Sequence, residues 1–182
     1  MGMSFEELDD ATRRCMIEEF ESEELGGRPY RGKDLSTAGL AVFPDLMREA
    51  MAKGDDDSLF ASMAVASYWK PTETYVLKGV ARERKVNIGQ AAERLARSEF
   101  NTWYVRGLCR RLMDEGVEQC QSYRAALPKW EPADCSSHEG QVFLVADIYR
   151  GHRARYWPEP GDPNAFSIPF QPGCHHTIRR LH

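Results

Sequence analysis

The sequence predicts an α+β fold, in which N-terminal helices, one of them long, precede a small β-sheet and a proline-rich C-terminal loop region. Three observations support this prediction. Apolar residues recur with a helical period through most of the first 114 residues. The apolar runs after Gly116 have β-character instead. Five prolines lie between residues 156 and 172, where turns and tertiary contacts must replace regular elements.

The first predicted helix spans residues 4–24. Its apolar side chains fall near a period of 3.6 residues, with acidic side chains between them. Ser4 and Glu7 have the spacing of a capping box, and the Gly26–Pro29 run ends the helix. An irregular linker is expected over residues 26–40, which are rich in glycine and short polar side chains.

Two shorter helices should follow. One is predicted at about 44–53, with Pro44 in its first turn and Gly54 at its end. The other is predicted at about 57–68, where the run Asp55–Asp57 favours a helix N-terminus by capping and through the helix dipole. The three aspartates do not have the alternating spacing of a calcium loop.

Residues 72–82 fit either a short helix or an extended segment. A long helix is predicted from 88 to about 114, because Asn87 and Gln90 have capping spacing and Gly116 ends the pattern. Three polar residues interrupt its apolar stripe and need buried partners: Ser98, Glu99 and Asn101. Strands are predicted at 117–126 and 142–145, followed by a short helix at 147–153.

Composition excludes some classes of protein. No run approaches the length of about 18 apolar residues that a membrane helix needs, so no membrane association is expected. The first ten residues have neither the basic nor the apolar region of a signal peptide, so secretion by that route is not expected. Five cysteines without an export signal favour a reducing compartment over a disulfide framework.

Charge is unevenly distributed along the chain. Residues 1–25 have nine acidic and two basic side chains, a charge of −7, so the rest of the chain carries +3 of the total of −4. This acidic segment fits a solvated helix face, or an electrostatic contact with a partner or with the body of the protein.

Cysteine and histidine residues cluster in the last third of the chain. Cys135 and His138 are two residues apart within one turn, and Cys174 and His176 would point to the same side of an extended segment. His175 would then point away unless the segment turns. Thiolate and imidazole are the preferred ligands of zinc, and two such pairs on separate loops can bind one ion. Alternatively, the cysteines are small buried side chains and the histidines are hydrogen-bonded.

Two other functions are compatible with residues of the sequence. A metal-dependent nuclease or other hydrolase would use His138 or His152 as its base, although the motifs of the common hydrolase families are absent from the sequence. Nucleic-acid contact would use basic residues of the long helix and the C-terminal tail: Arg106, Arg110, Arg111, Arg179 and Arg180. A solvated helix face balanced by Asp114 and Glu115 is, however, the favoured explanation of the helix residues.

Several motifs, in order, resemble the phage Mu-type head-morphogenesis (minor head protein) family. The run Ala96–Glu99, followed by Asn101 and a long helix, is similar to the Ala-Arg-Thr-Glu start of that domain. The family continues with a strand, Cys-x-x-Cys, a glycine, and His-Pro-x-Cys-x-Cys. Here these motifs read Cys135-x-x-His138, Gly140 and Gln171-Pro-Gly-Cys-His-His176. The resemblance covers about residues 94–180, and Gln171 departs from the family's histidine.

The resemblance implies a structural zinc site, since histidine replaces cysteine at two positions without loss of ligand chemistry. The implied ligands are Cys135, His138, Cys174 and His176, with His175 as an alternative. It also implies a minor-head-like α+β domain over 94–182, preceded by a helical extension over 1–93 that docks on a partner. Arg97 and Glu99 are expected to form a polar contact at the junction of helix and sheet.

The function implied is non-enzymatic: a minor capsid protein of a phage or prophage, which acts near the portal in head assembly or in DNA packaging and delivery. Its partners would be portal or capsid proteins, with nucleic acid as a further contact, and its location the virion or the bacterial cytoplasm. The alternatives are the hydrolase and a host-encoded binding module whose acidic N-terminal helix docks on a basic partner.

Overall fold

The structure is a computed structural model that describes residues 2–127 and 136–181. The described residues form five α-helices, which are α1 (Asp10–Leu25), α2 (Thr37–Lys53), α3 (Asp56–Met63), α4 (Ile88–Asp114) and α5 (Val145–Arg150). They also form the strands β1 (Thr72–Leu77), β2 (Val80–Lys85), β3 (Gln119–Arg124), β4 (Val142–Leu144) and β5 (His176–Arg180), and the short 3-10 helices η1 (Ala66–Tyr68) and η2 (Ser136–His138). The predicted α+β class is confirmed. No helix in the described part of the chain is both long and apolar enough to cross a membrane.

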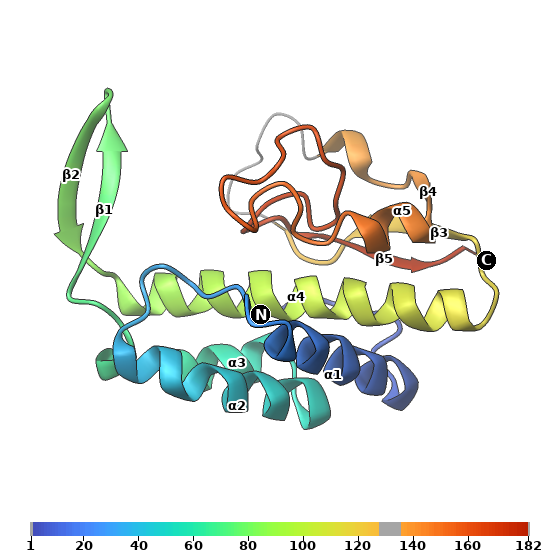
Figure 1. Ribbon diagram of the computed structural model, residues 1–182, viewed down its shortest axis with the longest axis horizontal. Coiled ribbons are helices and arrows are strands. Elements are labelled where there is room, and N and C mark those ends of the chain that lie inside the picture. Colours follow the sequence, from blue (N-terminus) through green and yellow to red (C-terminus); the bar gives the residue numbers. More distant parts are fainter. Residues whose placement is uncertain (1, 128–135, 182) are drawn as a thin grey trace.

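Helix α4 is the central layer of the molecule (Figure 1). Helices α1, α2 and α3 pack on one side of it, and the sheet, α5 and the proline-rich loops lie on the other. Sixteen of its 27 residues are buried, which is more than one face of a helix can supply. Two adjacent residues of α4, Trp103 and Tyr104, contact the two opposite layers. The Trp103 ring packs on Phe20 of α1 at 5.2 Å, whereas the Tyr104 hydroxyl donates to the carbonyl of Ile178 in β5 at 3.3 Å.

The long helix agrees with the sequence prediction at both ends. It spans Ile88–Asp114, and the Asn87 side chain accepts a hydrogen bond from the backbone N–H of Gln90 at 3.2 Å. The expected boundary between residues 93 and 94 falls inside this continuous helix. Residues on either side of that boundary belong to the same hydrophobic core.

The first helix begins later than predicted. Its N-cap is Asp9, whose carboxylate accepts from the N–H of Thr12, so the predicted start at Ser4 is wrong. Residues 2–8 instead cross the molecule, where the N–H of Ser4 donates to the carbonyl of Ala125 at 2.8 Å. The Phe5 ring packs on Tyr104 at 4.7 Å. Long-range contacts therefore override the local capping-box spacing.

The second helix is longer than predicted, and the third is shorter. Helix α2 begins at Thr37, capped by Ser36, so the predicted linker is shorter and Pro44 lies inside the helix rather than in its first turn. Helix α3 ends at Met63, and η1 continues the segment that was predicted to be helical. The predicted capping by the aspartates is confirmed, since Asp55 forms a capping box with Ser58.

The ambiguous segment after Pro71 is a β-hairpin. Strands β1 and β2 pair in antiparallel register from Thr72↔Lys85 to Leu77↔Val80. Lys78 and Gly79 connect them with φ values of 51° and 78°, the positive values of a type I′ turn. The hairpin projects from the body beside the start of α4 (Figure 1).

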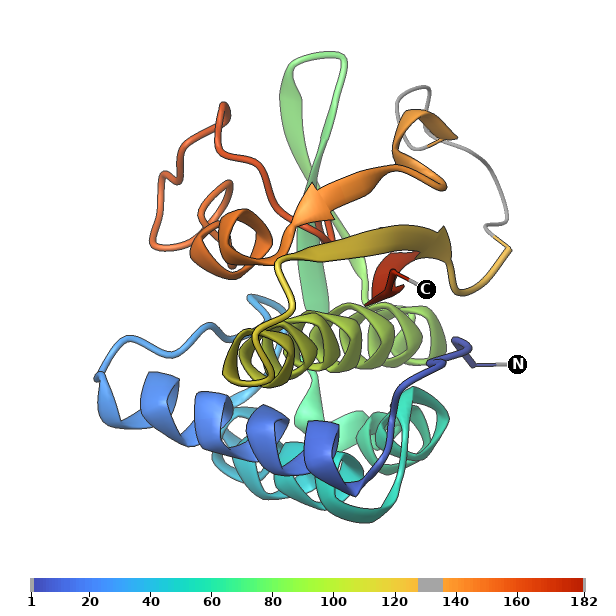
Figure 2. The same cartoon turned by 90° about the vertical axis from the view of Figure 1, so that its right-hand side faces the viewer.

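The second sheet is antiparallel, in the order β4-β3-β5, and covers α4 (Figure 2). Strands β3 and β4 lie within the predicted ranges, and α5 replaces the short helix predicted at 147–153. The sequence did not predict β5, which pairs with β3 from Cys120↔Arg180 to Arg124↔His176. This five-residue strand contains one of the proposed zinc ligands, His176.

Helices α1 and α4 approach most closely at Gly107. A Cβ added there would lie 2.6 Å from both the backbone nitrogen and Cγ of Met16. We therefore predict that Gly107→Ala lowers the free energy of unfolding by about 2–4 kcal/mol, although alanine is the better helix former.

The matched control is Gly89→Ala in the exposed first turn of α4, where the nearest atom would be 3.7 Å away. Its stability should stay within about 0.5 kcal/mol of the unsubstituted chain. Urea denaturation of the two variants measures both values. Equal stabilities would show that the α1–α4 contact is not tightly packed.

Candidate functional site

Two candidate metal ligands meet at the start of β5. The Sγ of Cys174 lies 3.7 Å from Nδ1 of His176, and both residues are buried, at 5% and 3% exposed. They share one side of the chain, as the alternation of an extended segment predicts. His175 between them is only half-buried, and its pKa is lowered by burial and by the charges of Arg97 and Arg124.

The distance between Sγ and Nδ1 fits either a hydrogen bond between thiol and imidazole or a shared zinc ion. A tetrahedral ion with Zn–S of about 2.3 Å and Zn–N of about 2.0 Å separates its two ligand atoms by roughly 3.6 Å. The Nε2 atom of His176 is buried and has no hydrogen-bond partner among the described residues, which is uncommon for a buried polar atom. Burial, and then the charge of Arg124, lower the pKa of His176. A neutral imidazole is the form that binds a metal.

The other two proposed ligands lie on the far side of the proline-rich region in sequence. His138 ends η2, where its carbonyl accepts a hydrogen bond from Oγ of Ser122 in β3. Its ring packs on Phe170 at 5.2 Å. Cys135 lies outside the described residues. Within residues 2–127 and 136–181, no three His, Cys, Asp or Glu side chains come close enough together to hold a metal ion. The four-ligand site therefore stays a prediction, and of its four candidate residues only Cys174 and His176 are seen in contact.

Polar residues of α4 hold the segment that carries this pair. The Ser98 hydroxyl accepts a hydrogen bond from the N–H of Gly173 at 2.7 Å. The side-chain amide of Asn101 donates to the carbonyl of His176 at 2.8 Å in the buried interior. These two residues interrupt the apolar stripe of the helix, and their partners are the residues that flank Cys174. The first and last motifs of the family resemblance are thus in direct contact.

The third interrupting residue, Glu99, forms the most buried ion pair. Its two carboxylate oxygens accept hydrogen bonds from Arg153 at 3.0 and 2.7 Å. Burial opposes the charge of Arg153, but Glu99 more than compensates and raises the arginine pKa. The guanidinium also packs over the rings of Tyr30 and Trp103, at 4.8 and 5.1 Å from their centroids. The pair therefore links α4 to the start of the proline-rich region.

Arg97 and Glu99 have different partners in the structure. Arg97 pairs with Glu93 at 2.9 Å, one turn earlier in the helix, and lies 3.9 Å from Asp56 at the start of α3. Glu99 faces the opposite layer and pairs with Arg153. Because residues two positions apart on a helix lie on different faces, each can tie α4 to a different layer. The sequence did not indicate Arg153 as the partner, since that partner lies 54 residues away.

The two histidines considered as hydrolase bases have different surroundings. His152 packs on Trp103 at 5.1 Å, and its Nε2 lies 3.2 Å from the Glu23 carboxylate. Burial lowers the pKa of His152 to about 4 despite this carboxylate. His138 lies against phenylalanine rings beside the sheet. Each imidazole therefore packs against aromatic rings, and the choice of either as a hydrolase base stays a prediction.

The basic residues considered for nucleic-acid contact are neutralised within the molecule. The arginines of α4 and β5 pair with carboxylates that lie largely in the acidic first 25 residues or at the end of α4: Arg106 with Glu19, Arg110 with Asp114, Arg111 with Asp9 and Glu115, Arg179 with Glu6, and Arg180 with Glu115. Much of the acidic N-terminal segment thus contacts the body of the protein itself. These ion pairs occupy the arginine side chains within the chain, and contact with nucleic acid stays a prediction.

Comparison of the chain with protein-family models, curated proteins and solved structures finds no match.

His152 should make stability dependent on pH. Its pKa of about 4 in the folded protein is below its ordinary value of 6.5, so the unfolded chain binds the proton first on acidification. The stability that the neutral imidazole contributes is complete above about pH 6.5 and is lost as the pH falls towards 4. Glu23 has a pKa of about 2 against an ordinary 4.5, so its contribution is lost only at lower pH.

We therefore predict that His152→Gln flattens this pH dependence. Between about pH 7 and pH 4.5, the unsubstituted chain should lose about 2 kcal/mol more unfolding free energy than the variant. Glutamine keeps a donor for Glu23 but does not titrate. Urea denaturation at a series of pH values measures the difference. Parallel curves for the two proteins would show that His152 is protonated equally in the folded and unfolded chains.

Proposed function

We propose that this chain is a non-enzymatic assembly protein of a phage or prophage head, of the minor capsid class. The observation that carries the proposal is the contact of Ser98 and Asn101 with the residues flanking Cys174. The family resemblance rests on two separated sequence motifs, and these motifs support each other at one buried junction.

In this proposal a zinc ion joins the two ends of the proline-rich region. Cys174 and His176 would bind it from the start of β5 and the residues just before it, together with His138 and Cys135, with His175 as the alternative to His176. Four protein ligands leave no position for substrate, so the ion would be structural. Bound zinc supplies a cross-link between loops that have few regular elements of their own. Ser98 and Asn101 of α4 hold the segment that carries Cys174 and His176.

The partners in this proposal are portal or capsid proteins, and the location is the virion or the bacterial cytoplasm. The pairing of the arginines with internal carboxylates favours protein partners over direct contact with DNA. Helices α1–α3, which the resemblance does not cover, would then present the docking surface of the N-terminal extension. No specific observation favours the hydrolase or the host-encoded module over this proposal.

Metal analysis tests the site. Protein purified without a nickel column should contain about one zinc per chain, because four thiolate and imidazole ligands bind zinc tightly. Cys174→Ser should lose the zinc and make residues 136–181 more sensitive to proteolysis. Cys109→Ser is the matched control, since Cys109 is buried in α4. Well-folded protein without zinc would remove the metal from the proposal.

Particle analysis tests the head assignment separately. Phage particles induced from the source strain and purified by density gradient should contain this protein at a fixed ratio to the portal protein, measured by quantitative mass spectrometry. Deletion of its gene should lower the yield of filled heads. Absence of the protein from particles, with unchanged yield on deletion, would contradict the assignment even if zinc is bound.

A further inference from the structure

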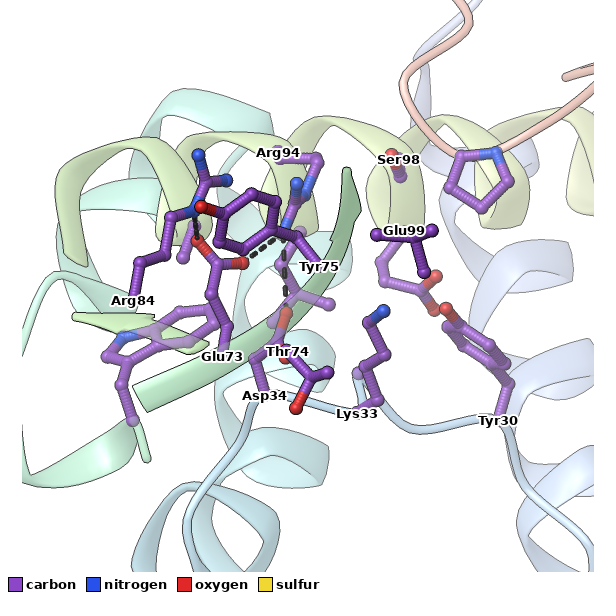
Figure 3. Close-up of a pocket in the computed structure, with 16 residues that line it drawn as sticks. Tyr30, Lys33, Asp34, Glu73, Thr74, Tyr75, Arg84, Arg94, Ser98 and Glu99 are labelled. Atoms are coloured by element: carbon purple, nitrogen blue, oxygen red, sulfur yellow. Dashed lines mark hydrogen bonds and ion pairs between the residues drawn. The ribbon is translucent and has the colours of Figure 1, made fainter. Parts of the chain in front are cut away.

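A cavity of about 540 Å³ lies in a fork between the β1–β2 hairpin and the body of the protein (Figure 3). At the base of the fork, Leu35 and Trp69 form an antiparallel bridge, and the N–H of Lys70 donates to the carbonyl of Asp34 at 2.9 Å. Beyond this point the two segments separate. One turns towards Tyr30, and the other continues as β1. The cavity is the space between them, with α4 as its floor.

Strand β1 presents its edge to this cavity. Glu73, Thr74, Tyr75 and Val76 all line it, and four consecutive residues of a strand can share one cavity only if the backbone edge faces it. In a hairpin closed by a two-residue turn, the residues flanking the turn are hydrogen-bonded to each other, so alternate residues direct their N–H and C=O groups outward. Here those residues are Thr74 and Val76. No backbone hydrogen bond from other described segments reaches this edge.

The cavity has unsatisfied positive charge. Lys33 stands between the two walls (Figure 3), and its ammonium has no carboxylate partner among the described residues. The three acidic side chains that line the cavity are already paired, Asp34 with Arg94 at 3.3 Å, Glu73 with Arg84 at 2.8 Å and Glu99 with Arg153 at 2.7 Å. Three exposed cations of the hairpin, Lys78, Arg82 and Lys85, also have no ion pair within the described residues, and only one exposed acid of the hairpin, Glu83, shares that state.

Apolar side chains complete the surface. Tyr30, Tyr75 and Leu95 line the cavity, and Val76 and Val80 near the hairpin turn are 71% and 57% exposed. An exposed strand edge with apolar side chains is normally blocked or covered, because it pairs readily with another chain. A two-stranded sheet is also only marginally stable without a third strand or a packed face.

We propose that the free edge of β1 binds an extended, acidic segment of a partner protein. The segment enters the fork as a third strand and continues the pairing that stops at Leu35 and Trp69. Its backbone bonds to Thr74 and Val76, its acidic side chains meet Lys33 and the hairpin cations, and its apolar side chains contact Tyr75 and Val76. This inference uses neither the zinc site nor the assignment to a phage head.

The experiment selects binders from a random library of peptides, about twelve residues long, displayed on yeast. The full chain should enrich peptides with an excess of Asp and Glu and with β-branched residues. Thr74→Pro removes the outward N–H of β1, a position where an edge strand tolerates proline. It should weaken the selected peptides at least about tenfold, whereas Thr74→Val, which keeps the N–H, should bind them within about twofold.

Charge-reversal variants test the electrostatic part of the proposal. Lys33→Glu should weaken the same peptides about tenfold, and Lys53→Glu, the same change at an exposed site in the last turn of α2, should not. Circular dichroism and thermal melting confirm that each variant is folded. Enriched peptides without acidic excess, or with equal affinity for Thr74→Pro, would overturn the proposal. So would a library without binders, or tight binding of a labelled DNA duplex that Lys33→Glu abolishes and Thr74→Pro does not.

Discussion

The burial of α4 on two sides is the constraint on which the rest of the structure depends. A helix covered on one side needs only an apolar stripe, but this one has α1–α3 on one side and the sheet on the other. Its buried polar residues therefore need partners inside the protein, because an unpaired polar group in the interior is costly. Glu99 binds Arg153, Ser98 binds Gly173, and Asn101 binds the carbonyl of His176. These contacts fix the position of the C-terminal layer on the helix.

The C-terminal layer needs such contacts because it has few regular elements. Between α5 and β5 the chain runs for 25 residues without a helix or strand. Near its start, the buried guanidinium of Arg153 packs over the rings of Tyr30 and Trp103. The indole N–H of Trp157 donates to the carbonyl of Arg28 at 2.9 Å. A region with so little core of its own gains much from a cross-link. That is the physical case for a metal at Cys174 and His176.

The distribution of charge separates internal from external surfaces. Carboxylates of the N-terminal segment neutralise arginines of α4 and β5, so the acidic and basic parts of the sequence largely cancel within the fold. Lys33 and three of the hairpin's cations, Lys78, Arg82 and Lys85, are different, since they have no ion-pair partner among the described residues. Cations without an internal ion pair can pair with acidic groups of a partner. The proposed binding of an acidic segment therefore uses the hairpin side of the molecule.

Local signals in the sequence determined the elements that need no distant partner. The period and caps of α4, the capping of α3 by Asp55, and the apolar run of β4 are readable within a few residues. Tertiary contacts decided the others. Ser4 has capping-box spacing but does not begin a helix, because its N–H donates to the carbonyl of Ala125. The segment His176–Arg180 is a strand because it pairs with β3. The sequence identified Cys174 and His176 as candidate metal ligands, and Ser98, Asn101 and Glu99 as polar residues that need buried partners. Only the fold brought the first four to one junction and supplied Arg153, because a buried charge is satisfied by whatever lies next to it in space.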